Sequence, residues 1–597
     1  MDQETKKCQN CKAPFVIELE DFDFYKKIDV PAPTWCPDCR RQRRLAFRNE
    51  RTLYRRKCNA PGHTEDIIST FSPDKPVTVY DEKYWWSDAW DPLSYGRPYD
   101  LTKPFFTQYA ELLRRVPLIA LSVTNMANCS FCNVSEGDKG SLYISASEKN
   151  ENVFYANRVV SNKDSADLYV ANQCELCYEL VGCHKCYRTL FSRNCTDCTE
   201  SAFLYNCTGC DHCFGCANLR NKSYYIWNVP YSKGEYEERI AAFDLGTASG
   251  VARARAEHEK LLSRSIRRFA HIIKSVGVTG DNVGYSKNCK EAFDLVGNPS
   301  VEDSKFINWG GAGAKDLYDC GPGIGVTLET AYEVTDTGIQ VARAFFTSVV
   351  YGSYDIWYSV NCHGSHNLFG CYGLRSKEHC ILNVQYTKEE YEALVPKIRQ
   401  QMMDMPYTDA KGRTYRYGEF FPFEVSPYAY NEVIAQEYFP LTKEQAQGAG
   451  YTWKESETKG YVPTIQPDEL PDGITDVPET VTNEIIACSH RGACVGQCAT
   501  AFRILPQELA FYRKMKLPLP RLCPNCRHEE RLKLRNPLKL WHRTCQCGGA
   551  TSTNGAYTNT ATHEHGTGKC EGEFETTYAP EKSEIVYCET CYQAEVM

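Results

Sequence analysis

Apolar residues fall into short runs along much of the chain, separated by Gly, Asn and Ser, a pattern typical of short β-strands joined by turns. Similar phrases recur as "KEAFD" (290–294), "KDLYD" (315–319) and "YDIWYS" (354–359). Their spacing, roughly 12 or 24 residues, favours a parallel β-solenoid in which each coil stacks on the next. Separate zinc knuckles strung on loops are the alternative. These phrases lie after the CxxC-rich stretch of residues 174–216. They keep its aromatic residues but have fewer cysteines around them, which favours the solenoid.

Two longer segments show that the solenoid region is duplicated. "FGCANLRNKSYYIWNVPYSKGEYE" (214–237) matches "FGCYGLRSKEHCILNVQYTKEEYE" (369–392). In each copy a hydroxyl residue precedes a Glu by three positions, which predicts a capping box at a helix start. We expect helices over 232–242 and 387–404, a further helix near 251–274, and a short one in "LTKEQAQ" (441–447). Each of the two related domains would then be closed by a helix.

A second duplication joins the two ends of the chain. Residues 11–58 align with 498–545 without a gap, and 19 of the 48 positions are identical. Average composition would give about three identities by chance. The copies share cysteines, prolines and an Arg-x3-Arg-x3-Arg pattern, so both ends carry one kind of module.

Cysteine spacing at the N-terminus predicts a metal site. Cys8, Cys11, Cys36 and Cys39 form C-x2-C-x24-C-x2-C, and four thiolates suit tetrahedral zinc. The second pair opens a segment of helix-forming residues, as in a treble clef, where the helix dipole helps to hold thiolate charge. The equivalent C-terminal ligands are Cys494, Cys498, Cys523 and Cys526.

A third zinc site is expected beyond them, formed by Cys545, Cys547, Cys588 and Cys591. Its ligand set stays open, because other metal-binding residues lie nearby. These alternatives are His563, His565, Cys570, Cys488 and His490. All-thiolate sites are closed, so we expect two to three or more structural Zn²⁺ ions rather than catalytic ones.

Further CxxC pairs lie between residues 174 and 216. They either bind more zinc or pack as buried thiols, since free Cys behaves as a small hydrophobe. We favour buried thiols.

The basic segment "CPDCRRQRRLAFRNERTLYRRKC" (36–58) raises the question of nucleic-acid binding. Arginines spaced four apart make one face of each finger helix, and such a stripe can follow a phosphate backbone. Internal pairing with acidic residues or thiolates is the alternative. The candidate residues are Arg40, Arg44, Arg48, Arg527, Arg531 and Arg535.

Composition narrows the class of protein. The formal net charge is -8, so an anion-binding surface would have to be local. There is no apolar signal region at the start and no apolar run of membrane-spanning length. Many CxxC pairs are typical of a reducing compartment. We therefore expect a cytoplasmic protein without a membrane partner.

Nucleotide-binding and hydrolase motifs are absent. Carboxylates at Asp316, Asp319 and Asp355 could serve a carbohydrate-active solenoid, but Asp in turns explains them more simply, and we expect no enzyme.

We therefore predict a mainly β chain with short helices, in which treble-clef zinc fingers at both termini flank two duplicated β-solenoid (parallel β-helix) domains rich in Cys and Tyr. The expected domains are a finger (1–65), a connecting region (66–128), the first solenoid (129–275), the second solenoid (276–404), a connecting region ending in an exposed linker near 463–480 (405–480), and the C-terminal finger with a further zinc module (481–597).

The phrase "F-x-I…FYxK…PxPxxCPxCR" resembles a zinc-binding treble-clef domain of bacterial proteins. The stretches "SPDKPVTVYDEKYWWSDAWDPLSYGR" (72–97), "QYTKEEYEALVPKI" (385–398), "QEYFPLTKEQA" (436–446) and "EIVYCETCYQAEV" (584–596) are similar to large cysteine-rich proteins of candidate-phyla-radiation bacteria. The resemblance implies zinc ribbons and an intracellular setting, and it implies no activity.

From these observations we expect a non-enzymatic, zinc-stabilised binding or scaffold protein. The leading hypothesis is binding of RNA or a ribonucleoprotein through the finger helices. The alternatives are a protein–protein scaffold that uses Tyr-rich solenoid faces, and a metal or thiol reservoir.

Overall fold

The computed structural model describes residues 3–455, 461–494 and 497–596. It is mainly β, with 32% strand and 22% helix, and contains about 21 solenoid turns. The predicted fold class is therefore confirmed. The chain divides into two compact units, each made of two separate stretches: unit 1 is Met1–Ser122 with Ala270–Lys454, and unit 2 is Val123–Phe269 with Glu455–Met597. Each unit therefore joins one solenoid to the finger at the distant end of the chain.

The solenoid of unit 2 begins at Val123, earlier than the predicted boundary at 129. Its coils are 12 residues long, as in the pairing of Asn157 with Tyr169 and of Asp211 with Ser223. The strands pair in parallel up to the last, antiparallel pair. They are β7 (Val123–Thr124), β8 (Asn133–Glu136), β9 (Ser145–Glu148), β10 (Glu151–Phe154), β11 (Asn157–Val160), β12 (Lys163–Asn172), β13 (Tyr178–His184), β14 (Tyr187–Leu190), β15 (Thr199–Ala202), β16 (Asp211–Phe214), β17 (Ser223–Ile226) and β18 (Val229–Pro230).

A three-residue period underlies each coil of this solenoid. From Asn125 to Trp227 every third residue has a positive φ. The backbone therefore turns after every three residues, and each 12-residue coil has short straight sides of three residues. From Cys132 to Cys216 every third residue is buried, and these residues form the interior. Sides this short leave a narrow interior. Cys, Ser, Ala, Val and Leu therefore dominate it, and no aromatic residue occurs at these positions.

Polar interior positions are satisfied from coil to coil. The Asn150 amide donates to Asp138 Oδ1 at 2.8 Å, and the Asn162 amide donates to Asn150 Oδ1 at 3.0 Å. The Cys174 backbone N–H donates to Asn162 Oδ1 at 2.9 Å, which extends the ladder by one coil. Each buried amide thus has a partner 12 residues away, as burial requires.

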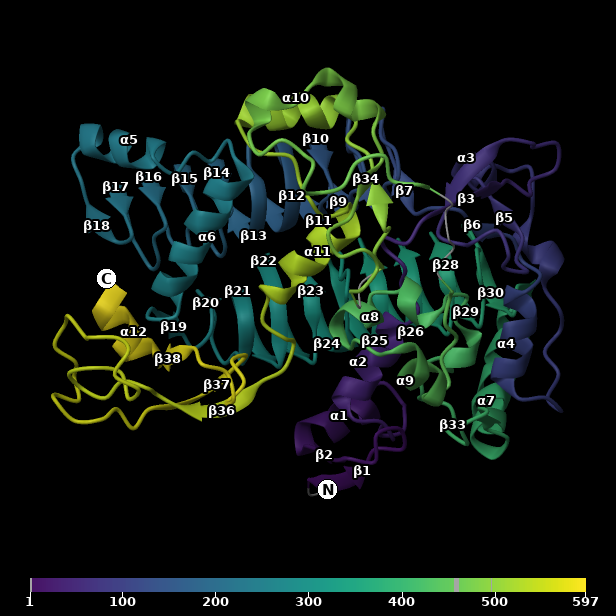
Figure 1. Ribbon diagram of the computed structural model, residues 1–597. Coiled ribbons are helices and arrows are strands. Elements are labelled where there is room, and N and C mark those ends of the chain that lie inside the picture. Colours follow the sequence, from purple (N-terminus) through teal and green to yellow (C-terminus); the bar gives the residue numbers. More distant parts are fainter. Residues whose placement is uncertain (1–2, 456–460, 495–496, 597) are drawn as a thin grey trace. The chain divides into compact units, whose positions relative to one another are not determined.

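The solenoid of unit 1 is less regular, with coils of 11 to 15 residues, as in the pairs Ile272–Val283 and Ser286–Val301. Figure 1 shows its parallel strands as a stack of teal and green arrows. The strands are β20 (Ile272–Ile273), β21 (Gly280–Lys290), β22 (Ala292–Lys305), β23 (Asn308–Gly310), β24 (Lys315–Cys320), β25 (Leu328–Gly338), β26 (Val341–Tyr351), β27 (Tyr354–Trp357), β28 (Val360–His363), β29 (His366–Phe369), β30 (Glu378–Ile381) and β31 (Val384–Gln385).

A capped helix closes each solenoid, as predicted. In α5 (Lys233–Ala241) and α7 (Lys388–Asp404), Ser232 and Thr387 accept hydrogen bonds from the backbone N–H three residues on. The helix expected near 251–274 is shorter and begins earlier, as α6 (Ala248–Leu262). The residues after it instead form β19 (Ile266–Arg268), which pairs with β38 (Ile585–Tyr587) of the same unit.

Each terminal finger consists of a short hairpin and two helices. The N-terminal finger (residues 4–58) contains β1 (Glu4–Lys7), β2 (Pro14–Ile17), α1 (Leu19–Lys27) and α2 (Pro37–Leu45), followed by β3 (Tyr54–Lys57) and β4 (Asp66–Ser69). The C-terminal finger (residues 486–540) contains β34 (Ile486–Ala487), β35 (Ala501–Phe502), α10 (Pro506–Met515) and α11 (Pro524–Lys533). The C-terminal module (residues 541–596) contains β36 (Trp541–Thr544), β37 (Glu573–Thr576), β38 and α12 (Glu589–Val596).

The connecting regions are packed rather than extended. The predicted exposed linker near 463–480 is wrong, because Leu470, Ile474, Val477 and Val481 are buried in the core of unit 2. The predicted short helix at 441–447 is present as α9 (Lys443–Gly448). The remaining elements of unit 1 are β5 (Val79–Tyr80), α3 (Glu82–Trp86), α4 (Phe105–Leu113), β6 (Leu118–Ile119), β32 (Tyr407–Thr408), β33 (Thr414–Tyr415) and α8 (Ala435–Tyr438). Within the described ranges, no helix combines the length and the apolar character that a membrane crossing needs.

Candidate metal centres and buried arginines

The predicted N-terminal quartet comes together. Cys8 and Cys11 lie in the turn between β1 and β2, while Cys36 is the N-cap of α2 and Cys39 lies in its first turn. Their four sulfur atoms lie within 4.8 Å of one another, and Cys11 Sγ is 3.7 Å from Cys36 Sγ. This group could hold a metal ion through four thiolates and no water, which is the donor set of a closed structural site.

The electrostatics of this quartet fit a bound cation. Hydrogen bonds with Cys36 and then Cys39 hold the pKa of Cys8 far below its ordinary value. The corresponding contacts with Cys36 and Cys8 raise the pKa of Cys39 far above it. Without a cation, the close thiols therefore cannot all ionise together, because each thiolate suppresses the ionisation of its neighbours. A divalent ion would remove this conflict.

The C-terminal finger has the same arrangement with one ligand changed. Cys488, Cys498, Cys523 and Cys526 form the group, so Cys488 occupies the place for which the sequence predicted Cys494. Cys523 is the N-cap of α11, as Cys36 is of α2. The Cys523 backbone N–H points to Cys488 Sγ at 3.3 Å, matching the Cys36 N–H to Cys8 Sγ at 3.3 Å.

An insertion explains the missed ligand. Cys8 and Cys11 are separated by two residues, whereas nine residues separate Cys488 from Cys498. A gap-free alignment therefore places Val495, not Cys488, opposite Cys8. Cys494 lies beside the quartet, in a smaller group with His490 and Cys526, and its sulfur is 3.6 Å from that of Cys526.

The C-terminal module also exchanges one expected ligand. Its all-cysteine group contains Cys545, Cys588 and Cys591, as predicted, but Cys570 takes the place expected for Cys547. The sulfurs of Cys570 and Cys588 are 3.9 Å apart. Cys547 instead joins a second group. The members of that group are Cys547, His563, His565 and Cys591.

The CxxC pairs of residues 174–216 have a different origin. They fall on successive interior positions of the solenoid, whose spacing of three produces the CxxC pattern. The thiols lie near backbone carbonyl oxygens nine residues on, for example Cys177 Sγ at 3.5 Å from the Cys186 oxygen. Burial raises the pKa of Cys183, Cys195 and Cys207 well above the ordinary value, so these thiols stay protonated and can donate. This geometry supports the interpretation as buried thiols.

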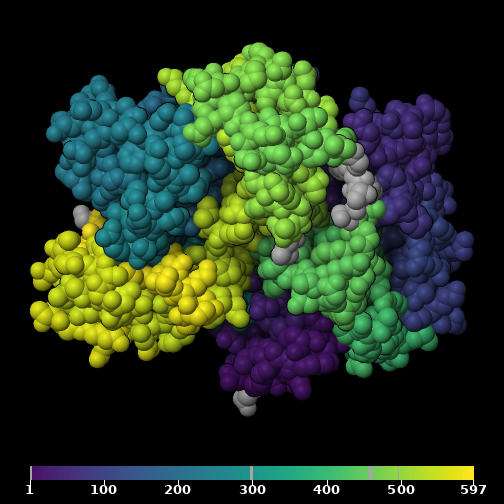
Figure 2. All heavy atoms as spheres, in the orientation of Figure 1, coloured from purple at the N-terminus to yellow at the C-terminus, as the bar shows by residue number. Residues whose placement is uncertain are grey.

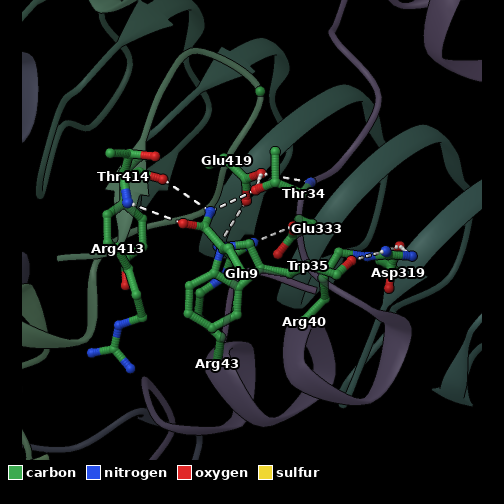
Figure 3. Close-up of polar contacts among 12 residues, drawn as sticks. Gln9, Thr34, Trp35, Arg40, Arg43, Asp319, Glu333, Arg413, Thr414 and Glu419 are labelled. Carbon is green, nitrogen blue, oxygen red and sulfur yellow. Dashed lines mark hydrogen bonds and ion pairs between the residues drawn. The ribbon is translucent and has the colours of Figure 1, made fainter. Parts of the chain in front are cut away.

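The arginines of α2 face the solenoid of unit 1. Arg40 and Arg44 both reach Asp319 on β24, with nitrogen–oxygen distances of 2.8 and 3.2 Å. Arg43 pairs with Glu333 on β25 at 2.5 Å and with Glu419 at 2.9 Å. Figure 3 shows Arg40 and Arg43 extending from the helix towards these carboxylates. The three arginine residues are at most 1% exposed.

The two solenoid carboxylates, Asp319 and Glu333, are buried as deeply as the arginines. Burial by itself would raise the pKa of Asp319, but Arg40 and Arg44 outweigh it and hold this pKa below the ordinary value. The guanidinium of Arg43 also stacks over Trp35, 4.6 Å from the ring centroid. Glu419 accepts from the Thr34 backbone N–H as well, so the 405–454 segment joins the same network, and Figure 2 shows this green segment beside the dark purple finger.

Unit 2 repeats this arrangement with one carboxylate. Asp167 on β12 lies 2.7 Å from Arg531 and 3.5 Å from Arg527, two arginines of α11 that correspond to Arg44 and Arg40. Arg527 also donates to the Tyr512 hydroxyl at 2.9 Å. In both units, therefore, the shared Arg-x3-Arg pair holds one buried Asp of the solenoid. We call this arrangement the arginine clasp.

The phosphate-binding interpretation of the stripe does not agree with this geometry. Arg40, Arg44, Arg48, Arg527 and Arg531 are all buried against their own unit, because solenoid carboxylates neutralise them. Arg48 pairs with Asp336 at 2.8 Å and with Glu50 at 2.6 Å. The sixth candidate, Arg535, is half-buried. Five of the six candidate arginines thus belong to contacts within their own unit.

An aromatic pair reinforces each clasp. Phe24 stacks on Tyr318 with centroids 3.9 Å apart, and Tyr25 lies 5.4 Å from Tyr332. Their counterparts in the C-terminal finger are Phe511 and Tyr512. These lie 6.2 and 5.8 Å from the ring of Tyr178 on β13. The identical Phe-Tyr dipeptides of the two fingers therefore serve the same contact.

The three carboxylates considered for carbohydrate chemistry are all engaged in ion pairs. Asp319 belongs to the clasp, Asp316 pairs with Lys27 at 2.7 Å, and Asp355 pairs with Arg343 at 2.6 Å. All three have positive φ values, as residues at solenoid turns do. A structural role therefore accounts for each of them.

No protein-family model matches the chain, and no curated protein matches it.

Proposed function

We propose that the protein is a zinc-stabilised, non-enzymatic scaffold in which treble-clef fingers lock two β-solenoids into rigid binding platforms. The observation that carries this proposal is the pairing of a closed four-cysteine group with an arginine clasp in each finger. The same helix, α2 or α11, begins at two of the cysteines and carries both arginines of the clasp. A metal ion that orders this helix also places the arginines on the solenoid.

Zinc is the metal that the donor sets favour. Four thiolates in a compact group suit tetrahedral Zn²⁺, and they leave no position for water or substrate. Structural zinc of this kind contributes folding free energy directly, on the order of 10–16 kcal/mol of apparent binding in isolated fingers. We therefore assign the ions a structural role.

Protein partners fit the accessible surface better than RNA does. The arginines that would contact phosphate are buried, while aromatic rings stack along the outside of the unit 2 solenoid. Phe131, Tyr143 and Tyr155 occupy the same position in three successive coils, with centroids 4.5 and 5.7 Å apart, and Tyr155 at one end of this stack is buried beneath Arg527. Tyr143 is 44% exposed, and Tyr187 on β14 is 39% exposed. Exposed tyrosines of this kind are common in protein interfaces.

Metal analysis of the natively purified full-length chain tests the proposal. We expect at least three zinc ions per chain, and chelation should lower the urea midpoint of unfolding. Co-purifying partners should be proteins, with an absorbance ratio at 260/280 nm typical of protein, and Tyr143→Ser with Tyr187→Ser should reduce their recovery. A metal-free folded chain would contradict the zinc role. Nucleic acid that is lost steeply with added salt would favour RNA binding instead.

A further inference from the structure

The C-terminal module contains two ligand groups that share one thiolate. Cys591 belongs both to the all-cysteine group with Cys545, Cys570 and Cys588 and to the second group with Cys547 and two histidines. Within each group the ligand atoms lie within 4.8 Å of one another. Seven side chains therefore surround two adjacent positions. They fill the eight ligand sites of two tetrahedral ions if one thiolate is shared.

The two histidines of the second group are oriented as metal ligands. His563 Nδ1 lies 3.5 Å from Cys547 Sγ, and His565 Nε2 lies 3.3 Å from Cys591 Sγ. The other ring nitrogen of each histidine faces an acceptor: Nε2 of His563 is 2.8 Å from Glu595 Oε1, and Nδ1 of His565 is 2.9 Å from the Gly568 carbonyl oxygen. Metal-binding histidines characteristically donate their second N–H in this way, which fixes the tautomer and the ring.

Glu595 provides an independent sign of a built site. Its side chain is fully buried, and it accepts from the backbone N–H groups of Thr560 and Ala561 and from the Tyr557 hydroxyl at 3.0 Å. It lies one helical turn after Cys591 on α12, so both side chains project from one face of that helix. This buried carboxylate is held in place by several donors and orients the His563 ring. The all-cysteine group contains no histidine, so an ion in that group alone would not explain why His563 is oriented.

We propose that the C-terminal module binds two metal ions, one held by Cys545, Cys570, Cys588 and Cys591 and the other by Cys547, His563, His565 and Cys591, with the Cys591 thiolate bridging them. The proposal rests on the zinc-binding role proposed above and adds a fourth ion to the chain. Glu595 is a positioning residue for the second ion. A pair of ions bridged by one sulfur cross-links the 545–570 loop to α12 at two points.

Metal stoichiometry of the full-length chain tests this proposal without any substitution. After loading with zinc and desalting, native mass spectrometry should show four ions per chain. After loading with ¹¹³Cd, two resonances should be mutually coupled, because their ions share one sulfur. A chain that retains three ions, or four ions with no coupled pair, overturns the bridged site. A chain that retains no ion overturns the proposed function itself.

Substitutions then assign the fourth ion. His565→Ala should remove one ion and the coupling while three ions remain. Glu595→Gln should keep all ligands and weaken retention of one ion by about 10- to 100-fold. The matched control is His542→Ala, because His542 lies in the same module but is 61% exposed and pairs with Glu575. Equal metal content in His565→Ala and the control would contradict the assignment.

Discussion

The arginine clasp of unit 1 predicts a large loss of stability when its carboxylate is neutralised. In Asp319→Asn the shape of the side chain is kept, but Arg40 and Arg44 lose the anion that lies 2.8 and 3.2 Å away. All three side chains are at most 2% exposed, so water cannot replace the carboxylate. Breaking a buried ion pair from one side costs about 3–5 kcal/mol. That is a large fraction of the roughly 5–15 kcal/mol that stabilises a typical domain.

A neighbouring residue provides the matched control. Asp316 lies on the same strand and also forms an ion pair, with Lys27 at 2.7 Å, but Lys27 is 54% exposed. Because water screens this pair, Asp316→Asn should cost at most about 1 kcal/mol. The two variants share the strand and the substitution, and they differ in burial and in the cations lost, which are two buried arginines for Asp319 and one exposed lysine for Asp316.

Urea unfolding followed by tryptophan fluorescence measures both variants. Seven of the nine tryptophans belong to unit 1, so the signal reports mainly on the unit that carries the substitution. The free energy of unfolding should fall by about 3–5 kcal/mol for Asp319→Asn and by less than about 1 kcal/mol for Asp316→Asn. Equal losses in the two variants would refute the reasoning.

The pH dependence gives a second check on the same carboxylate. The pKa of Asp319 is held below its ordinary value, so its contribution is present above about pH 4 and is lost as the pH falls through the lowered pKa. The difference in stability between wild type and Asp319→Asn should therefore be constant near neutral pH and shrink in acid. A difference that grows in acid would contradict an ionised Asp319.

Three further predictions concern other parts of the chain. Burial lowers the pKa of His258 to about 3, so unit 2 should lose about 1.4 kcal/mol per pH unit between about pH 6 and pH 4, and His258→Gln should flatten this slope in urea titrations at several pH values. Cys488→Ser should lower the zinc content by one ion in elemental analysis, whereas Cys494→Ser should leave it unchanged. Leu204→Ala, inside the unit 2 solenoid, should cost about 2–5 kcal/mol in the same unfolding assay, against little change for the exposed Tyr187→Ala.

The sequence was sufficient to predict the solenoid but not its three-residue side. The spacing of the recurring aromatic phrases indicates a 12-residue coil, because equivalent outer positions recur once in each coil. The interior period is also present in the sequence, where Ser192, Cys195, Cys198 and Ser201 follow one another at intervals of three. The CxxC pairs obscured it, because two cysteines separated by two residues are equally typical of metal ligands.

The metal centres were predictable as modules but not ligand by ligand. Local spacing identified the N-terminal quartet, since both of its pairs are C-x2-C. In the C-terminal finger the ligand Cys488 is separated from its partner by an inserted loop, and in the C-terminal module Cys570 and Cys547 exchange roles. Loop paths decide which sulfurs meet in these cases, and spacing alone does not specify a loop path.

The arginine stripe shows why charge in a sequence is ambiguous. Arg40 and its partner Asp319 are 279 residues apart, so no local pattern connects them. The helix by itself has the composition of a nucleic-acid-binding surface. Only the tertiary structure shows that turn residues of a distant solenoid carry the compensating charge, which turns an apparent phosphate-binding face into a buried contact.

The two duplications that look separate in the sequence describe one repeated unit. The fingers are offset by 487 residues and the solenoids by about 155, yet each finger clasps one solenoid through equivalent residues: Arg40 and Arg44 hold Asp319, and Arg527 and Arg531 hold Asp167. The N-terminal finger belongs to the second solenoid and the C-terminal finger to the first. Because neither unit is a continuous stretch of chain, each finger–solenoid contact closes a loop of several hundred residues. The clasp and the metal-ordered helix that carries it must therefore offset a large loop-closure entropy, which explains why the cysteines, the Phe-Tyr pair and the Arg-x3-Arg pair are the features that both fingers share.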